Sequence, residues 1–252
     1  RAGDGKMLPW VMRVSADLPV AVVTGGNRGV GREVCRQLAL LGYQVVLCSR
    51  DLRAGELAAK EIDPDGARIA ACQLEVDNSL SVAALADWVK GRLGRTDVLV
   101  NNAASGYDRW ATASNADLGT VAEAIDVTLF GAWRVIHALL PMLRQSARPR
   151  IVNVSGEGGS IAGMTGGSPA YAVSKAGLNA LTRLLAGELA RDGILVNAVC
   201  PGWTEENLPW GRIGAPRSRT VAQAAASVIW AVTIPNGGPT GTFTRDGRPY
   251  PW

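Results

Sequence analysis

Short runs of apolar residues alternate with amphipathic stretches from residue 19 to about residue 235. The apolar runs are nearly continuous, which is typical of strands buried on both faces of a parallel sheet. The expected strands are Pro19–Thr24, Tyr43–Cys48, Ala67–Val76, Asp97–Val100, Ile151–Ser155 and Ile194–Val199. The expected helices are one that ends near Gly42, then Leu80–Leu93, Asp117–Leu143 and Tyr171–Arg191. Strands joined by right-handed helical crossovers predict an α/β fold with a doubly wound parallel sheet of the Rossmann type.

The length of the chain agrees with this architecture. With 252 residues, 47% of them hydrophobic, the chain can bury one core and is short for two domains. We therefore expect a single domain over residues 18–252. Residues 1–17 are expected to form an N-terminal extension, introduced in part by cloning, outside that domain.

Charge and cysteine content exclude several functional classes. The net charge of +4 comes from dispersed basic residues, so we expect no binding of nucleic acid. The spacing of the four cysteines forms no metal-ligand pattern, which predicts no metal site and a reduced, cytoplasmic protein. No uninterrupted apolar run reaches the roughly 18 residues of a membrane-spanning helix, so we expect no membrane partner.

A glycine-rich turn, Thr24-Gly25-Gly26-Asn27-Arg28-Gly29-Val30-Gly31, joins the first expected strand to the first expected helix. Glycine lets the backbone turn tightly and approach a pyrophosphate, and the N–H groups at a helix N-terminus favour an anion. Because strand, turn and helix occur in this order, we interpret the turn as a dinucleotide-binding site. The expected contacts come from Gly25, Asn27, Arg28, Gly29, Val30 and Gly31.

The second expected strand leads into Ser49-Arg50, where an acidic residue would favour NAD by binding the adenosine ribose. Arg50, together with Arg28, instead suits the 2′-phosphate of NADP through charge-assisted hydrogen bonds. We expect Asp51 to point into the next turn. The sequence predicts NADP(H) as cofactor, with contacts from Ser49 and Arg50, and keeps NAD as the less favoured alternative.

Further motifs follow in order: Asn101-Asn102-Ala103, Tyr171-Ala172-Val173-Ser174-Lys175 and Pro201-Gly202. With the glycine turn, they make residues 19–252 resemble a classical short-chain dehydrogenase/reductase, and the tail from Gly238 to Trp252 is similar to the carbonyl-reductase branch. The resemblance implies that Tyr171 donates a proton to the carbonyl oxygen and that Lys175 binds the nicotinamide ribose. The spacing agrees, because residues i and i+4 share a helix face, where a cation favours ionisation of the phenol.

The resemblance implies further cofactor contacts. Glu75 stands where the family has an aspartate near the adenine, and Thr204 is expected to contact the nicotinamide carboxamide, because Glu206 replaces the family's threonine. Ala104 replaces a glycine. The cofactor contacts implied in this way are Glu75, Val76, Asn101, Ala103, Tyr171, Lys175, Pro201, Gly202 and Thr204.

Two residues of the family's catalytic tetrad are replaced. Gly156 stands at the catalytic serine, while Ser155 should point the other way and Ser160 would substitute only if its loop folds back. Thr128 stands at the asparagine, and its hydroxyl would partly replace that side chain. Because losing one oxyanion donor typically costs about 10²–10³ in rate, either a substrate group replaces the serine or the reaction does not need it.

Three glutamates fall in loops expected to rim the site: Glu157, Glu205 and Glu206. Their carboxylates would attract a cation, and an iminium carbon generates no oxyanion. One hypothesis is therefore an imine or iminium substrate, or a ketone bearing a basic amine. The alternative is that the glutamates are solvated loop residues.

Aromatic residues flank the same cleft: Tyr107, Trp110, Trp203 and Trp210. They suggest a wall for a polycyclic or aryl substrate, and the alternatives are packing or a subunit interface. We expect a structural role for His137, which lies in an apolar stretch of the long helix.

Three functions follow from these observations. The first is an NADPH-dependent reductase of a carbonyl or imine/iminium group in an aromatic or polycyclic small molecule, in specialised biosynthesis. The second is a non-redox enzyme on the same fold that catalyses cyclisation, dehydration or isomerisation. The third, a non-catalytic protein that binds a cofactor or acts as a scaffold, disagrees with the presence of both Tyr171 and Lys175. A homodimer or homotetramer is expected, because no long segment covers the helix faces that the family uses for pairing.

Overall fold

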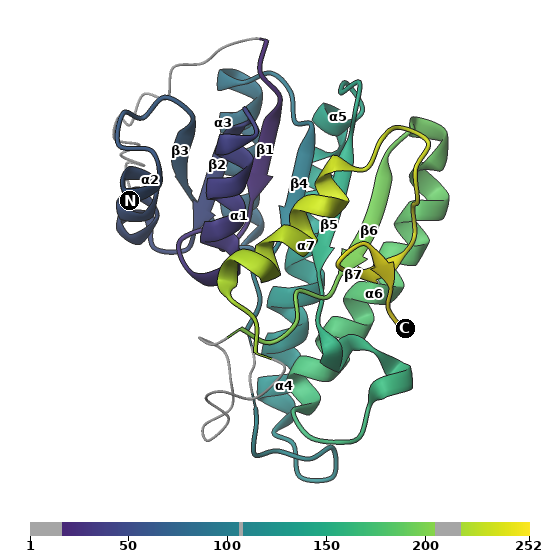
Figure 1. The fold of residues 1–252 in the computed structure, drawn as a ribbon. Helices are drawn as coiled ribbons and strands as arrows, with labels where there is room; N and C mark the ends of the chain where they lie inside the picture. Colours follow the sequence, from purple (N-terminus) through teal and green to yellow (C-terminus); the bar gives the residue numbers. More distant parts are fainter. Residues whose placement is uncertain (1–16, 106–107, 205–217) are drawn as a thin grey trace.

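The computed structural model describes residues 17–105, 108–204 and 218–252. One eight-stranded sheet runs through this part of the chain in the order β3-β2-β1-β4-β5-β6-β7-β8 (Figure 1). Neighbouring strands from β3 to β7 are parallel, and β8 is antiparallel to β7. The strands are β1 (Val20–Val23), β2 (Gln44–Ser49), β3 (Ile69–Gln73), β4 (Val98–Asn101), β5 (Arg150–Val154), β6 (Leu195–Val199), β7 (Phe243–Arg245) and β8 (Arg248–Pro249). The predicted doubly wound α/β fold is confirmed.

Helices cover both faces of the sheet. One face packs against α1 (Gly29–Leu40), α2 (Leu52–Ile62) and α7 (Val221–Thr233), and the other against α3 (Ser79–Arg92), α5 (Gly131–Leu143) and α6 (Pro169–Leu189). Helix α4 (Leu118–Ile125) leads into α5. Short helical turns are η1 (Asp126–Phe130), η2 (Glu157–Gly159), η3 (Ile161–Gly163) and η4 (Ala190–Asp192).

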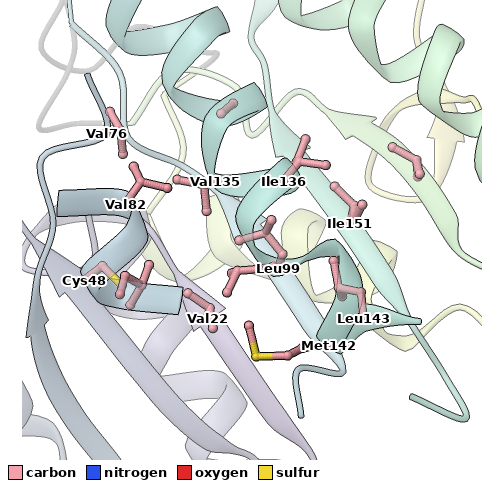
Figure 2. Packing of buried hydrophobic residues seen from close by; sticks show 14 of the residues in the cluster. Val22, Cys48, Val76, Val82, Leu99, Val135, Ile136, Met142, Leu143 and Ile151 are labelled. Carbon is pink, nitrogen blue, oxygen red and sulfur yellow. The ribbon is translucent and has the colours of Figure 1, made fainter. Parts of the chain in front are cut away.

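The core on the second face is built from strand and helix side chains that meet directly. Val22, Leu99 and Ile151 belong to three neighbouring strands, and Val135 and Met142 lie on α5 in the same cluster (Figure 2). Each such aliphatic side chain contributes about 1.5–3 kcal/mol when it is fully buried. The near-continuous apolar strands of the sequence are therefore explained by helices on both faces.

The predicted long helix is continuous but contains a π-helical turn, η1, between α4 and α5. By length and composition alone, the stretch Leu118–Leu143 could cross a membrane. Its buried side chains on α5, such as Val135 and Leu139, instead belong to the core cluster. Packing against the sheet therefore accounts for the apolar character of this helix.

Strand order reverses at β1, because β2 lies on one side of it and β4 on the other. In such sheets the loops beyond the carboxyl ends of the strands diverge at the reversal and leave a crevice for a ligand. The glycine turn follows β1 and the Asn101-Asn102-Ala103 motif ends β4, so two of the motifs meet at this point.

Candidate active site

The glycine turn carries the chain from β1 into α1 with little room for side chains. Gly25 has a φ of +63°, a conformation that favours glycine. A Cβ at Gly31 would overlap the carbonyl oxygen of Gly25 and the amide of Asn102. The residue before α1, Arg28, is extended and its side chain does not cap the helix. The first N–H groups of α1 thus remain available to an anion such as a pyrophosphate.

Asn102 fixes this turn against β4, a role that the sequence analysis did not assign. Its side-chain amide donates to the carbonyl oxygens of Thr24 and Gly25 at 3.0 Å. The N–H groups of Asn102 and Ala103 both donate to Oγ1 of Thr24. Asn101 was expected to line the cofactor cleft, but its amide donates to Oδ1 of Asn153 within the sheet. The side-chain oxygen of Asn101 is buried and has no hydrogen-bond partner among the described residues.

Two guanidinium groups face solvent at the end of β2 and in the glycine turn. Arg28 and Arg50 are exposed, and neither side chain makes a hydrogen bond or ion pair within the described residues. Asp51 caps α2 by accepting the N–H of Ala54, in agreement with the expectation that it points into the next turn. Arg53, in the first turn of α2, is a third exposed and unpaired arginine there that the sequence analysis missed.

The segment after β3 lies beside the same crevice. The N–H of Glu75 donates to Oγ of Ser81 at 3.0 Å, and the Glu75 side chain is half-buried. Val76 is buried, and a Cβ at Gly131 would lie 2.7 Å from its side chain. Val76 thus packs the segment after β3 against the start of α5.

Tyr171 and Lys175 lie on one face of α6, as their spacing predicts. Both are buried, and Nζ of Lys175 lies 5.9 Å from the centre of the Tyr171 ring. The ammonium donates to the carbonyl oxygen of Val154 at 2.6 Å. Burial lowers the pKa of Lys175 to about 8, because the charged form loses hydration. Asp108 holds the start of α6 by accepting the N–H groups of Ala170 and Tyr171.

The Tyr171 ring rests on a glycine-rich backbone segment. A Cβ at Gly156 would overlap the Tyr171 hydroxyl oxygen and would lie 3.2 Å from Cζ. A Cβ at Gly158 would lie 2.8 Å from the ring, and one at Gly159 would lie 2.9 Å from Cβ of Lys175. The hydroxyl of Tyr171 thus occupies the space that the side chain of a residue at position 156 would fill.

The three hydroxyl groups considered as substitutes, those of Ser160, Ser155 and Thr128, differ in their surroundings. Ser160 donates to the carbonyl oxygen of Trp252, toward the C-terminus. Ser155 is buried, and its hydroxyl has no hydrogen-bond partner within the described residues. Thr128 lies in the π turn η1, where its Oγ1 is 3.5 Å from the N–H of Ser105. A π turn often marks a functional site, and η1 packs on α6, where a Cβ at Gly177 would lie 2.8 Å from the Leu129 side chain.

The segment after β6 approaches Tyr171 from another direction. Trp203 follows Pro201-Gly202, and its ring centre lies 6.4 Å from that of Tyr171. Thr204 is buried, and its hydroxyl finds no hydrogen-bond partner among the described residues. An unpaired hydroxyl beside this loop fits the carboxamide contact expected of Thr204.

The structure changes the interpretation of the glutamates and aromatic residues. Glu157 forms an ion pair with Arg245 at 2.6 Å and accepts the indole N–H of Trp203. Arg245 therefore compensates the charge of this carboxylate. Trp110 is 85% exposed. Among the described aromatic residues of this set, Trp203 is the one whose ring lies beside that of Tyr171. The other predicted rim residues lie outside the described residues: Tyr107, Glu205, Glu206 and Trp210.

Metal and histidine chemistry find no support in the described part of the chain. The four cysteines are free and buried, and the described residues hold no group of histidine, cysteine and acidic side chains that could bind a metal. His137 is exposed on α5 and accepts the indole N–H of Trp133 at 2.8 Å.

Comparisons with known proteins agree with this arrangement. Residues 19–210 match the family model described as short chain dehydrogenase. Short-chain dehydrogenase/reductase 1 of Saponaria officinalis is 33% identical over 88% of this chain and 92% of its own length. Salutaridine reductase of Papaver bracteatum is 31% identical over 88% and 93%. The NADPH-bound carbonyl reductase from chicken fatty liver superposes with a TM-score of 0.82 at 27% identity, over 93% of this chain and 94% of its own. The chain therefore belongs to the short-chain dehydrogenase/reductase family of oxidoreductases, in its carbonyl-reductase-like branch.

Proposed function

We propose that the protein is an NADPH-dependent reductase that transfers a hydride to the carbonyl carbon of an aromatic or polycyclic small molecule. The observation that carries this proposal is the buried pair on α6, with Tyr171 placed over Gly156 and Lys175 beside it. The names of the relatives support it, since they include a salutaridine reductase and a carbonyl reductase that binds NADPH. The same names favour a place in specialised biosynthesis.

The residues of the crevice fit a dinucleotide. The uncapped N-terminus of α1 would hold the pyrophosphate, and the unpaired Arg28 and Arg50 would hold a 2′-phosphate. Pro201, Gly202 and the unpaired hydroxyl of Thr204 would contact the nicotinamide. When bound, the reduced nicotinamide supplies the hydride.

The chain's own residues would supply the proton and orientation. Tyr171 would donate its phenolic proton to the substrate oxygen as charge develops there, and Lys175 would stabilise the phenolate that remains. Because Gly156 contributes no hydroxyl, Tyr171 would be the donor to that oxygen among the tetrad positions. The compensated charge of Glu157 favours a neutral carbonyl substrate over an iminium ion.

The test is a reduction assay with an aryl ketone, an aromatic diketone and a cyclic iminium, following the loss of reduced-nicotinamide absorbance. We expect NADPH consumption with the ketones and formation of the matching alcohol. A product at the oxidation level of the substrate, formed without NADPH consumption, would refute the proposal and favour cyclisation, dehydration or isomerisation.

Cofactor preference gives a second expected outcome. Arg50→Glu should lower kcat/KM for NADPH by about 10- to 100-fold, since a charge-assisted hydrogen bond contributes roughly 1.5–3 kcal/mol. The kcat/KM for NADH should change little or rise. Arg191→Glu is the matched control, because Arg191 is also exposed and unpaired among the described residues but lies in η4, before β6. Equal losses with both cofactors would contradict a role for Arg50 at the 2′-phosphate.

We further propose that residues 18–252 act as one domain, in a cytoplasmic homodimer or homotetramer. The single sheet through the described residues supports the first part of this proposal. Light scattering of the purified protein measures its molar mass and so tests whether it is a dimer or a tetramer.

A further inference from the structure

Glu157 links three segments that are distant in the sequence. Its Oε2 accepts the indole N–H of Trp203 at 2.8 Å, and its Oε1 accepts from Nη2 of Arg245 at 2.6 Å. Glu157 belongs to η2, Trp203 to the segment after β6, and Arg245 to β7. One half-buried carboxylate therefore uses both of its oxygens to hold partners from two other parts of the fold.

Two surfaces beside Tyr171 are connected to this carboxylate. Glu157 lies between Gly156 and Gly158, whose backbones leave room for the hydroxyl and ring of Tyr171. The indole that Glu157 holds has its ring centre 6.4 Å from the Tyr171 ring, at an angle of 37°. A movement of Glu157 would therefore change the glycine segment and the indole together.

Arg245 connects the same carboxylate to the start of the Pro201-Gly202 loop. Its guanidinium also donates to Sγ of Cys200, the residue before Pro201. It lies over the Tyr250 ring with its carbon 4.4 Å from the ring centre. This gives Arg245 a fixed position from which to hold Glu157, because aromatic stacking and hydrogen bonding restrict its side chain.

We propose that Glu157 is a positioning residue for carbonyl reduction, which acts through Trp203 and Arg245 to keep the Tyr171 hydroxyl beside Gly156. This inference rests on the proposed function. Because Gly156 supplies no hydroxyl of its own, the placement of the Tyr171 hydroxyl decides the alignment with the substrate oxygen. Because a displacement of about 1 Å at a reacting group can cost 10²-fold in rate, a carboxylate that fixes its surroundings has a large effect on turnover.

The activity test uses Glu157→Gln, Glu157→Ala and Trp203→Phe. We expect kcat to fall by about tenfold or more in Glu157→Ala, and less in Glu157→Gln, which still accepts the indole N–H. The Kd for NADPH, measured by cofactor fluorescence, should stay within about twofold of the unmodified protein. Glu188→Gln is the control, because Glu188 is an exposed glutamate on α6 without a partner among the described residues.

The combined variant Glu157→Ala/Trp203→Phe should be no slower than the slower single variant, because both substitutions break the same contact. Losses that multiply would overturn the proposal, as would an unchanged kcat in Glu157→Ala. If Glu157→Ala does not fold, Trp203→Phe decides, since it keeps an aromatic ring and the ion pair but lacks the N–H donor. An unchanged kcat in that variant would then overturn the proposal.

A spectroscopic measurement separates this inference from the proposed function. The indole N–H signal of Trp203, assigned by its loss in Trp203→Phe, should show slow hydrogen exchange and move upfield in Glu157→Ala. It can be recorded without cofactor or substrate. If Glu157→Ala moves the indole signal but the unmodified protein reduces none of the substrates, the proposed function is refuted, while the hydrogen bond between Glu157 and Trp203 is supported. Reductase activity with an indole signal that Glu157→Ala does not move would refute the inference alone.

Discussion

Replacing Gly156 with alanine should lower turnover about 100-fold, close to the loss expected for Tyr171→Phe. An added Cβ at position 156 would overlap the Tyr171 hydroxyl oxygen. The φ of Gly156 is 177°, an extended conformation open to any residue, so the effect is steric and does not come from backbone strain. The tyrosine would have to move its hydroxyl by an ångström or so, which can cost about 10² in rate.

A serine at position 156 should fail in the same way. It would introduce the residue type that the resemblance implies at this position, but its Cβ meets the same oxygen before its hydroxyl reaches any substrate. In this chain the observed position of the Tyr171 hydroxyl thus requires a residue without a side chain at position 156. Turnover should fall in Gly156→Ser as well as in Gly156→Ala, and Tyr171→Phe/Gly156→Ala should be no slower than Tyr171→Phe.

The measurement is kcat and KM for an aryl ketone at saturating NADPH, with thermal unfolding as a check of folding. Gly187→Ala is the matched control, because Gly187 lies in the same helix as Tyr171 and its added Cβ meets no atom within 4 Å. That variant should keep the turnover of the unmodified protein. Full activity of Gly156→Ser would contradict the steric argument.

The fold followed from the sequence because strands buried on both faces are almost purely apolar. Positions of the main strands agree to within one or two residues, as for β2, predicted as Tyr43–Cys48 and found as Gln44–Ser49. Strand β3 is shorter than the predicted Ala67–Val76, since only Ile69–Gln73 pairs with β2. The residues after it, Leu74 and Val76, are apolar because they pack in the core outside the sheet.

The π turn η1 could not be predicted from periodicity. Apolar residues continue through Asp126–Phe130 at helical spacing, so the pattern indicates one uninterrupted helix. The structure shows close packing on both sides of this turn, with Val76 against Gly131 and Leu129 against Gly177. These are long-range contacts, and no local propensity encodes them.

In the candidate site, too, the local geometry was predictable from the sequence and the long-range contacts were not. The i and i+4 spacing of Tyr171 and Lys175 on one helix predicted their shared face, because a helix fixes that geometry locally. The partners of Glu157 were missed because Trp203 and Arg245 are 46 and 88 residues away in the sequence. A glutamate in a glycine-rich loop is indistinguishable from a solvated one until the fold brings an arginine to it.

Lys175→Met should abolish most of the activity and yet make the protein more stable at neutral pH. Burial lowers the pKa of Lys175 from its usual 10.5 to about 8, because the ammonium is desolvated. At neutral pH the lysine is protonated in both the folded and the unfolded chain. The difference in pKa then corresponds to a penalty of roughly 3 kcal/mol in the folded state.

The pH dependence has a definite sign. Between pH 8 and 10.5 the unfolded chain binds more protons at this site than the folded chain does, so the lysine's contribution to the unfolding free energy rises with pH. Below pH 8 the full penalty is present. Methionine removes the charge at all pH values, so its stabilising effect should be largest at neutral pH and smallest near pH 10.

Thermal unfolding of the cofactor-free protein measures this effect. After allowance of about 1.5 kcal/mol for the lost charge-assisted hydrogen bond to Val154, the net gain of roughly 1.5 kcal/mol should raise Tm by about 3–6 °C at pH 7. Lys90→Met is the control, because Lys90 is exposed on α3 and its replacement should shift Tm little and equally at both pH values. A Tm for Lys175→Met that is lower by the same amount at neutral and alkaline pH would mean that Lys175 is retained for stability. A higher Tm at neutral pH together with lost turnover would mean that the folded state carries a desolvated cation because the chemistry at Tyr171 requires it.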